Sequence, residues 1–490
     1  MPNQQTTFAD DPSTGSGLDL LLEIKRPRLR AGLIDALRDA IRSGRLAAGT
    51  RLPASRVLAD DLGIARSTVT ECYAELVAEG WLTARQGSGT RVARLAPPRD
   101  DSSVAPAADA HPGKAVQGLL PGAAEFAEFP RQQWLAAARR ALAAAPYSAF
   151  GYGDPAGRME LRVALSDYLS RVRGVRAEPE RIVISSGFHH GLALTAQALT
   201  ARGARTVAVE GYGLGLYRAL LSDAGLRIPP LLVDDDGART GDLKDLGADA
   251  VLLTPAHQFP TGVALAPARR ADVRDWARAS GGLILEDDYD GEFRYDRTPV
   301  GALQGLDPER VLYFGTASKS LAPALRVGWM VVPESILPEI LAAKGRVETV
   351  SVLDQLTLAE FVTSGAFDRH VRSRRQNYRR RRDQLISALA QSSPEVRVKG
   401  MAAGLQALIE LPRGTEAAVV QAAARLGLMV SGMAEFRHEA LHATAAVHDG
   451  LVVNFSAISD SAWEGALDLL CSVMPAPGRQ RPNRPSRSRR

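Results

Sequence analysis

Apolar residues recur at helical spacing near the start of the chain, at Leu33, Ile34, Leu37, Ala40 and Ile41. This spacing predicts a first helix, and similar patterns predict a second over residues 53–62 and a third that opens at Ala65. Two short strand candidates, residues 81–83 and 90–92, flank the turn Gln86-Gly87-Ser88-Gly89. Three helices followed by a hairpin predict a winged helix-turn-helix.

The third predicted helix opens with side chains that suit contact with DNA, namely Arg66, Ser67, Thr68 and Thr70. Short hydroxyl donors and an arginine at the N-terminus of a helix reach base edges in the major groove. The positive end of the helix dipole also attracts phosphate, and a Gly-rich turn lets the backbone approach a groove closely. Local spacing leaves a second interpretation open, in which these polar residues only cap the helix.

Residues 49–92 contain a specific combination of short sequence elements: Leu-Pro-x-x-Arg, Arg-Ser-Thr-Val and Gly-Trp-Leu followed by Gly-Ser-Gly-Thr. The run closely resembles the winged helix of GntR-type regulators. This resemblance implies contact with double-stranded promoter DNA through Arg56, Arg66, Ser67, Thr68, Thr70, Gln86 and Gly87. Some members of that family carry Thr where this chain has Ala65, so the resemblance implies no contact there.

Farther along the chain, apolar β-branched runs alternate with amphipathic helical stretches; the runs are residues 181–184, 206–209, 250–253, 283–285 and 311–314. This alternation predicts an α/β unit with a largely parallel, buried sheet. Ligands of such sheets bind at the carboxyl ends of the strands. The chemically useful residues expected at that edge are Gly187, 210–212, 287–289 and 316–319.

The residues at this edge could together hold pyridoxal 5′-phosphate (PLP). A desolvated lysine such as Lys319 can form a Schiff base with an aldehyde. Thr316 and the amides around Gly187 could hold a phosphate at a helix N-terminus. Asp287 could pair with the protonated ring nitrogen that gives this cofactor its electron sink, and Tyr212 could stack on the ring. Taken singly, a lysine beside Ser and Thr is usually a surface residue, and Asp pairs after strands often only cap helices.

The joint spacing of these pieces is more specific than any one of them. The pieces are FGYGDPAG at 150–157, SSG at 185–187, EGY at 210–212, TPAHQFPTG at 254–262, EDDYD at 286–290 and GTASK at 315–319 with Arg326. Over nearly its full length this unit resembles a fold-type I aminotransferase of the aspartate aminotransferase class.

That resemblance implies a role for each matching residue. Lys319 would form the Schiff base, Asp287 would bind the ring nitrogen, Tyr289 would donate to the ring oxygen, and Tyr152 would reach the site from a second subunit of a homodimer. The full set of implied cofactor-binding residues is Tyr152, Gly187, Phe188, Tyr212, Asp287, Tyr289, Thr316, Ser318, Lys319 and Arg326. We expect no metal site.

Both halves occur in the order found in the MocR-type subfamily of GntR regulators, which the chain resembles as a whole. We therefore predict an α/β protein with an N-terminal winged helix-turn-helix and a large aminotransferase-like domain. The predicted parts are a disordered arm at 1–17, a DNA-binding domain at 18–95, a linker at 96–116, a PLP-binding effector domain at 117–474 and an Arg-rich disordered tail at 475–490.

The formal charge of +5 on the 490 residues is unevenly distributed. Residues 18–95 hold 13 Lys and Arg against 9 Asp and Glu, residues 479–490 hold six Arg and no acid, and the long middle is mildly acidic. The tail is expected to be a solvated end, with auxiliary attraction to DNA as the alternative. The chain has only two cysteines and no apolar run long enough to span a membrane, which favours a cytoplasmic location.

Three residues depart from the pattern of the enzymes or of a known sensor. Val452 stands where aminotransferases place an arginine that binds the substrate carboxylate, and Phe259 stands where they commonly have Asn beside the ring oxygen. Leu214 stands near the position of an arginine used by the member of the family that senses 4-aminobutanoate. Ordinary amino-acid turnover is therefore disfavoured.

We hypothesise a transcriptional regulator, not an enzyme, that binds a primary-amine effector through an external aldimine with PLP. The effector would be an amino acid or an ω-amino compound such as taurine, and the regulated genes would serve its metabolism. Two alternatives remain: a regulator of vitamin B6 genes that senses PLP itself, and an active aminotransferase that carries a DNA-binding module. The Arg-dense stretch 369–382 is expected to form a solvated or interdomain face, with contact to DNA or to the winged helix as the alternative.

Overall fold

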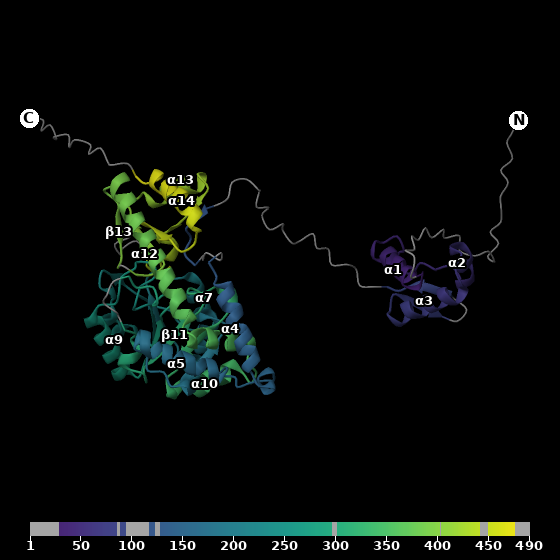
Figure 1. The fold of residues 1–490 in the computed structure, drawn as a ribbon, viewed down its shortest axis with the longest axis horizontal. Coiled ribbons are helices and arrows are strands. Elements are labelled where there is room, and N and C mark those ends of the chain that lie inside the picture. The colour runs from purple at the N-terminus through teal and green to yellow at the C-terminus, as the bar shows by residue number, and fades with distance from the viewer. Residues whose placement is uncertain are drawn as a thin grey trace, which may run out of the picture. The chain divides into compact units, whose positions relative to one another are not determined.

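The structure is a computed structural model of the chain. It describes residues 29–85, 89–94, 117–122, 128–295, 301–401, 403–441 and 449–475. The chain divides into two compact units, residues 1–111 and 112–490 (Figure 1). The predicted arm, the predicted linker and the predicted tail after Pro475 lie outside the described residues. The boundaries drawn from the sequence stay predictions.

The first unit is the winged helix-turn-helix that the sequence predicts. Its elements are α1 (Leu29–Arg42), α2 (Ser55–Leu62), α3 (Arg66–Ala78), β1 (Leu82–Arg85) and β2 (Gly89–Val92), and the two strands are antiparallel. Leu33, Leu37 and Leu76 are fully buried in its core. The second helix begins two residues later than predicted, because Ala54 has an extended backbone with ψ 146°. It ends at Gly63, whose φ of 62° favours glycine.

A seven-stranded sheet forms the centre of the second unit, in the order β4-β12-β11-β10-β9-β5-β6. The strands are β4 (Ile182–Ser185), β12 (Gly328–Val331), β11 (Val311–Thr316), β10 (Leu283–Asp287), β9 (Ala250–Leu253), β5 (Val207–Glu210) and β6 (Pro230–Leu231). β12 runs antiparallel to both of its neighbours, and the other pairs of this sheet are parallel. The prediction of a largely parallel, buried sheet is confirmed, although β12 itself was not predicted.

Helices cover both faces of this sheet. They are α5 (Met159–Arg173), α6 (Phe188–Ala201), α7 (Gly215–Asp223), α9 (Pro267–Ser280), α10 (Leu337–Lys344) and α11 (Val352–Thr363). Successive strand residues enter different cores: Val183 packs in a cluster that includes Leu192 of α6, whereas Ile182 and Ile184 pack in a cluster that includes Leu165 of α5. This alternation follows from the two-residue period of a strand, and it explains why the strands are apolar throughout.

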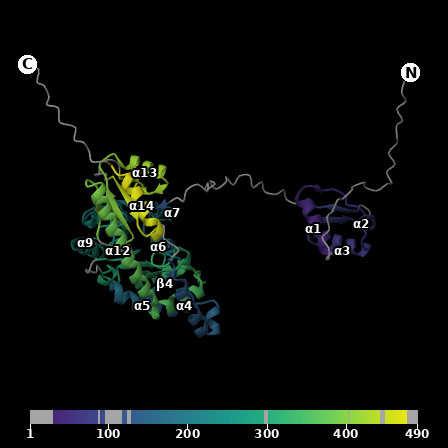
Figure 2. The same ribbon diagram turned by 45° about the horizontal axis from the view of Figure 1, so that its top comes forward.

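A smaller antiparallel sheet, in the order β13-β14-β17-β16, completes the second unit. The strands are β13 (Arg397–Lys399), β14 (Gln406–Glu410), β17 (Gly450–Asn454) and β16 (Ser431–Gly432), and α13 (Glu416–Arg425) and α14 (Asp460–Ser472) pack with them. The 27-residue helix α12 (Ala366–Ser392) runs between the two sheets (Figures 1 and 2). At the start of the unit, β3 (Gln117–Gly118) pairs with β15 (Leu428–Met429) beside the small sheet.

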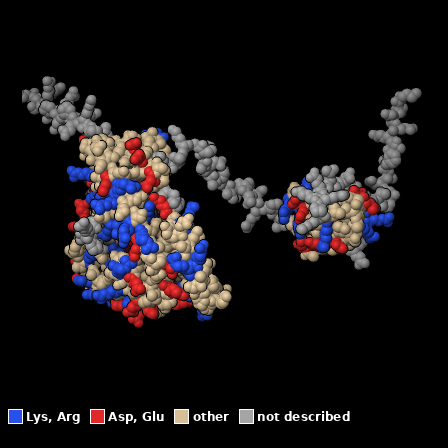
Figure 3. All heavy atoms as spheres, in the orientation of Figure 1, with Lys and Arg blue, Asp and Glu red and all other residues tan. Residues whose placement is uncertain are grey.

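The Arg-dense stretch of α12 divides between solvent and core. Arg372 and Arg379 are exposed, and Figure 3 shows basic side chains gathered over the middle of the second unit on the face that it draws. Arg381 is fully buried and donates to the carbonyls of Phe455 and Ile458 at 2.8 and 2.7 Å. The stretch was expected to form a solvated or interdomain face: Arg372 and Arg379 are solvated, whereas Arg381 is buried and ties α12 to the small sheet.

Candidate functional site

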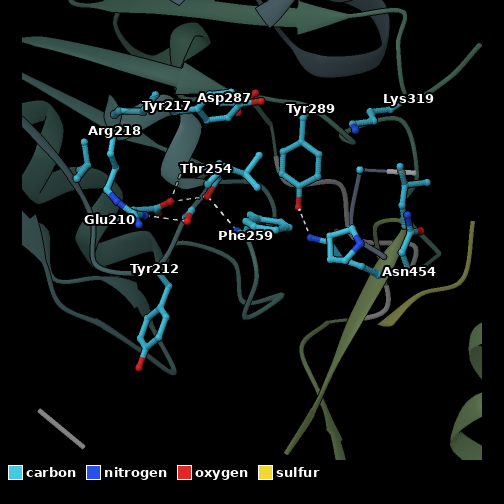
Figure 4. Close-up of a pocket in the computed structure, with 18 residues that line it drawn as sticks. Glu210, Tyr212, Tyr217, Arg218, Thr254, Phe259, Asp287, Tyr289, Lys319 and Asn454 are labelled. Atoms are coloured by element: carbon cyan, nitrogen blue, oxygen red, sulfur yellow. Dashed lines mark hydrogen bonds between the residues drawn. The ribbon is translucent and has the colours of Figure 1, made fainter. Parts of the chain in front are cut away.

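A pocket opens where the carboxyl ends of β5 and β10 meet the small sheet (Figure 4). It encloses about 860 Å³ including its open mouth. Its chemically active lining residues are Glu210, Tyr212, Tyr217, Arg218, Thr254, Asp287, Tyr289, Lys319, Gln406 and Asn454. A concave pocket lined by a few convergent polar groups is the usual form of a small-molecule site.

Asp287 and Lys319 face this pocket from the ends of neighbouring strands. Asp287 is the last residue of β10, and Lys319 follows the end of β11 by three residues. Burial lowers the pKa of the Lys319 ammonium, opposed by the carboxylates of Asp287 and Asp290. Burial and the charges of Asp288 and Asp290 hold the pKa of Asp287 well above its usual range. Burial therefore favours the neutral form of Lys319. It also destabilises the ionised form of Asp287, and the protein's own positive charges do not offset this effect.

Tyr289 is held in the pocket by its hydroxyl. The hydroxyl donates to the carbonyl of His257 at 3.2 Å and accepts from Nε2 of Gln406 at 3.1 Å. The ring of His257 is held in turn, because its Nδ1 lies 2.8 Å from a carboxylate oxygen of Asp290. Burial and the carboxylate of Asp290 hold the pKa of Tyr289 well above its usual range, so the phenol stays protonated and can donate.

The start of α6 lies beside a guanidinium and two hydroxyls. Gly187 precedes the 14-residue helix with φ 90°, and Arg326 donates to the carbonyl of Ser186. A Cβ placed on Gly187 would lie 3.5 Å from the Arg326 guanidinium. The Thr316 hydroxyl accepts from the Ser318 amide at 3.1 Å, and Thr316 reaches the Gly187 region across β12. Free helix amides, an arginine and two hydroxyls are the donors that a phosphate needs.

Three of the predicted cofactor residues do not lie over Asp287 and Lys319. The ring of Phe188 packs against Phe314 and Tyr217 beneath the pocket, at centroid distances of 5.0 and 4.7 Å. Tyr212 borders the pocket, but Figure 4 shows its ring directed away from both residues. Tyr152 is 94% exposed and lies outside the pocket lining. Stacking by Tyr212 and a contribution by Tyr152 from a second subunit stay predictions.

The sequence pattern does not mark several residues of the pocket. Arg218 lines the pocket from α7, and Gln406 and Asn454 line it from the small sheet. Glu210 was expected only as part of a strand end. Its carboxylate accepts from the Thr254 hydroxyl at 2.5 Å and from Gln258 at 3.2 Å, and burial raises its pKa to about 7. Arg218 could have been predicted as a pocket residue because it lies one helical turn after Leu214. No sequence pattern marks the pocket residues of the small sheet.

The residues that depart from the enzymes lie where the sequence indicates. Val452 is fully buried in β17, within an apolar cluster that includes Tyr212 and Phe259. Val452 and Asn454 share one face of the strand because they are two residues apart, and Asn454 lines the pocket. Phe259 and Leu214 also line it. The strand position of the expected arginine therefore presents an apolar surface.

In the winged helix, the predicted DNA-binding residues at the start of α3 are available. Arg66, Ser67 and Thr70 are exposed, Thr68 is half-buried, and Arg56 is exposed on α2. Ala65 caps α3 without any side-chain hydrogen bond, so these polar residues do not act as its N-cap. The Thr70 hydroxyl donates to the carbonyl of Arg66 at 3.0 Å. Gln86 and Gly87 lie outside the described residues.

Two kinds of site are absent from the described part of the chain. It contains no group of three or more His, Cys, Asp or Glu side chains placed to hold a metal ion. It also contains no helix long and apolar enough to cross a membrane.

Two family models match the chain, one for each unit. Residues 29–92 match the family described as bacterial regulatory proteins of the gntR family. Residues 118–449 match the family described as aminotransferase class I and II. Because the second match covers more than half of the chain, the similarity extends well beyond the pocket.

Bacterial transcriptional regulators match most of the chain. They include the probable rhizopine catabolism regulatory protein MocR of Rhizobium meliloti, 31% identical over 80% of this chain and 84% of its own length. The pyridoxine biosynthesis regulator PdxR of Corynebacterium glutamicum is 30% identical over 82% of this chain and 88% of its own. The regulator TauR of Rhodobacter capsulatus is 33% identical over 76% of this chain and 82% of its own.

Among solved structures, an archaeal alanine:glyoxylate aminotransferase superposes with a TM-score of 0.66. It covers 74% of this chain and 91% of its own, at 24% sequence identity. This likeness shows that the second unit has the fold of those enzymes.

Proposed function

Since the chain belongs to the MocR-type GntR regulators, which join a winged helix to an aminotransferase class I and II domain, we propose that it is a PLP-dependent regulator that senses a primary amine. The membership makes it a DNA-binding regulator with an aminotransferase-like domain. The proposal adds the cofactor, the chemical class of the effector and the link between effector and DNA. The observation that carries it is the pocket in which Lys319 and Asp287 lie together beside a buried Val452.

The residues of the pocket, together with those beside the start of α6, fit PLP. Asp287 would hold the ring nitrogen, because a protonated ring nitrogen supplies the positive charge that this buried carboxylate lacks. Arg326, Thr316 and the amides after Gly187 would hold the phosphate, and Tyr289 would donate to the ring oxygen. When bound beside Lys319, PLP supplies an aldehyde that captures primary amines reversibly.

Sensing explains the pocket better than turnover does. With Val452 at this position, the strand face beside Asn454 offers no positive charge to bind a substrate carboxylate. Phe259 adds a further apolar side chain to the pocket lining. Efficient transamination requires the carboxylate to be clamped so that the reacting bond keeps one orientation. Binding of an amine without such a clamp is compatible with slow chemistry and a long-lived bound state, which suits a sensor.

The pocket is lined by residues from both sheets, so a bound effector can contact both. Tyr289 and Asp287 come from the large sheet, whereas Gln406 and Asn454 come from the small sheet. An effector that contacts both sides changes the free energy of one arrangement of the two sheets relative to another. We propose that this shift alters how the winged helix of each chain is presented to DNA.

A homodimer is part of the proposal. Large apolar side chains are exposed on α4 (Arg131–Ala144) and the turn that follows it: Leu135 at 64%, Tyr147 at 96%, Phe150 at 53% and Tyr152 at 94%. Such a concentration of apolar surface marks an interaction site. A second copy would cover it and bring Tyr152 toward the neighbouring pocket.

The test is a titration of purified full-length protein with PLP and then with candidate amines, followed by the absorbance of the bound cofactor and by an assay for keto or aldehyde product. Sensing predicts a saturable absorbance change with product formed at less than one equivalent per site. Sustained product formation supports the enzyme instead. If no amine changes the absorbance but PLP alone changes DNA affinity, the protein senses PLP, a function for which its similarity to PdxR is the supporting observation.

A further inference from the structure

The hydroxyl of Tyr289 is surrounded by hydrogen-bonding groups of the protein. Nε2 of Gln406 donates to its oxygen at 3.1 Å, the bond drawn from Tyr289 in Figure 4. The hydroxyl itself donates to the carbonyl of His257 at 3.2 Å, and Nδ1 of His257 also lies 3.2 Å from the oxygen. Gln406 and His257 are buried, so water does not easily replace them. Because a phenol has one hydrogen and two lone pairs, these neighbours decide where the hydrogen points.

Asp290 fixes the position of the hydrogen on the ring of His257. Nδ1 of His257 lies 2.8 Å from a carboxylate oxygen of Asp290, and both side chains are buried. A carboxylate accepts hydrogen bonds, so Nδ1 carries the hydrogen and cannot accept one from Tyr289. The hydrogen of the Tyr289 hydroxyl therefore goes to the carbonyl of His257 or to a ligand in the pocket.

The segment before β14 holds Gln406 against Tyr289. The amide of Gly404 donates to the carbonyl of Phe293 at 2.7 Å, which joins this segment to the one that follows β10. A Cβ placed on Gly404 would come within 2.1 Å of a ring carbon of His257, and the φ of Gly404 is 80°. Only glycine allows so close an approach. The start of β14, and with it Gln406, is thus placed directly beside the hydroxyl.

Gln406 makes Tyr289 a stronger donor toward the pocket. A hydrogen bond that a hydroxyl accepts polarises it and strengthens the hydrogen bond that it donates. Phe259 lines the same part of the pocket, with its ring centroid 6.4 Å from that of Tyr289, and its side chain has no polar atom to offer a ligand. The Tyr289 hydroxyl is therefore the group through which Gln406 can act on a bound ring.

We infer that Gln406 is a positioning residue that acts on bound PLP through Tyr289. It holds the phenol oxygen so that the hydrogen points to the ring oxygen of the cofactor, and it thereby lowers the pH at which the bound cofactor loses its proton. Loss of that proton leaves the negative ring oxygen in greater need of an external donor, so a stronger donor favours the deprotonated form. This inference rests on the proposed binding of PLP at Lys319.

The experiment is a pH titration of the cofactor absorbance in full-length protein loaded with PLP. Gln406→Met keeps the length of the side chain but removes its donor, and should raise the midpoint by about half a pH unit or more. Gln197→Met, at an exposed position of α6, is the matched control and should leave the midpoint unchanged.

A second pair of variants distinguishes positioning from general support. Tyr289→Phe should also raise the midpoint, and adding Gln406→Met to Tyr289→Phe should raise it no further, because the hydroxyl that carries the effect is absent. A purely structural defect would instead add the same change in both backgrounds. If Gln406→Met fails to fold, Gln406→Asn keeps a polar amide that is too short to reach the hydroxyl and should raise the midpoint in the same way.

An unchanged midpoint in Gln406→Met or Gln406→Asn overturns the inference, as does an equal rise on adding Gln406→Met to Tyr289→Phe. In either case a wild-type absorbance that titrates with pH still supports the bound cofactor of the proposed function. If wild-type protein mixed with PLP shows no cofactor absorbance after removal of the free compound, both the proposed function and this inference are wrong.

Discussion

At the scale of single residues, the pocket places a lysine and an aspartate where neither carries its usual charge easily. Burial lowers the pKa of Lys319 and raises the pKa of Asp287 well above its usual range. Each charge is stabilised by the other, and a cationic ring on Asp287 would replace Lys319 in that role. A cationic ring bound at Asp287 would therefore stabilise the ionised carboxylate and let Lys319 lose its proton.

The Lys319→Ala variant tests the covalent role of this lysine. Wild-type protein mixed with PLP and then treated with borohydride should retain a cofactor chromophore through denaturation, because reduction makes the bond to the lysine permanent. The variant should lose at least nine-tenths of that absorbance, whereas Lys244→Ala, at an exposed position, should keep it. Retention in Lys319→Ala would assign the bond to another lysine.

Glu210 predicts a dependence of stability on pH. Burial raises its pKa in the folded protein to about 7, above the value near 4.3 of an unfolded chain. Between these values the folded state holds the proton more tightly, so the free energy of unfolding falls as pH rises, by at most about 1.4 kcal/mol per pH unit from this group.

In protein free of cofactor, Glu210→Gln should flatten the fall of the denaturation midpoint between pH 5 and pH 7. The same substitution at exposed Glu178 is the matched control and should leave the slope unchanged. An identical slope in wild type and Glu210→Gln would show that the carboxylate ionises without cost in the folded protein.

The sequence identified part of the pocket for a physical reason. Asp287 ends a buried strand and Lys319 follows the next one, and parallel strands bring their carboxyl ends to one edge. Gln406 and Asn454 belong to a separate sheet whose approach depends on the long helix α12, so no local spacing marks them. Arg218 belongs to an ordinary amphipathic helix, and only the structure shows that its Nε–H has no acceptor among the described residues.

At the scale of elements, α3 is the helix that should enter a DNA groove. Its N-terminus presents Arg66 and Ser67 to solvent, while Val69 and Leu76 hold the opposite face in the core. The helix is therefore fixed by its apolar face and free to bind through its first turn.

Arg66→Ala should weaken binding to the promoter about 5- to 150-fold, as expected for the loss of one arginine contact of about 1–3 kcal/mol. Arg42→Ala removes the same charge from the end of α1 and should change the affinity less than two-fold. Fluorescence anisotropy with labelled promoter DNA measures both. Equal losses in the two variants would indicate attraction by net charge alone.

The exposed apolar surface around α4 gives a second prediction at this scale. Leu135→Glu should raise the dissociation constant of the dimer at least ten-fold, because a carboxylate would replace an apolar contact. Leu426→Glu is the matched control, since Leu426 is 48% exposed beyond α13. Sedimentation at several concentrations measures the equilibrium. A wild-type monomer, or equal effects of both changes, would remove α4 from the interface.

Most elements followed their sequence pattern, and the exceptions have local causes. The strands around Val183 and Leu285 were predicted because their apolar, β-branched runs are buried on both faces. β12 escaped prediction because it is short, begins at Gly328 and contains no such run before Val331. Gly328 is required there, since a Cβ would come within 2.7 Å of the Gly187 backbone.

At the scale of the whole molecule, the net charge of +5 does not identify the DNA-binding part. The six arginines of residues 479–490 supply a larger excess of positive charge than residues 18–95 do. DNA binding is assigned instead by the winged helix and its match to GntR regulators. The second unit is identified as an aminotransferase-like domain by its sheet order, its pocket and its match to aminotransferases.

In the proposed function, the pocket of one unit controls the DNA affinity of the other. The most direct test is the dissociation constant for promoter DNA of PLP-loaded, full-length protein, measured with and without a saturating primary amine. The amine should change this constant at least five-fold in the wild-type protein and less than two-fold in Lys319→Ala. An unchanged constant in wild-type protein whose pocket is demonstrably filled by the amine would contradict the claim.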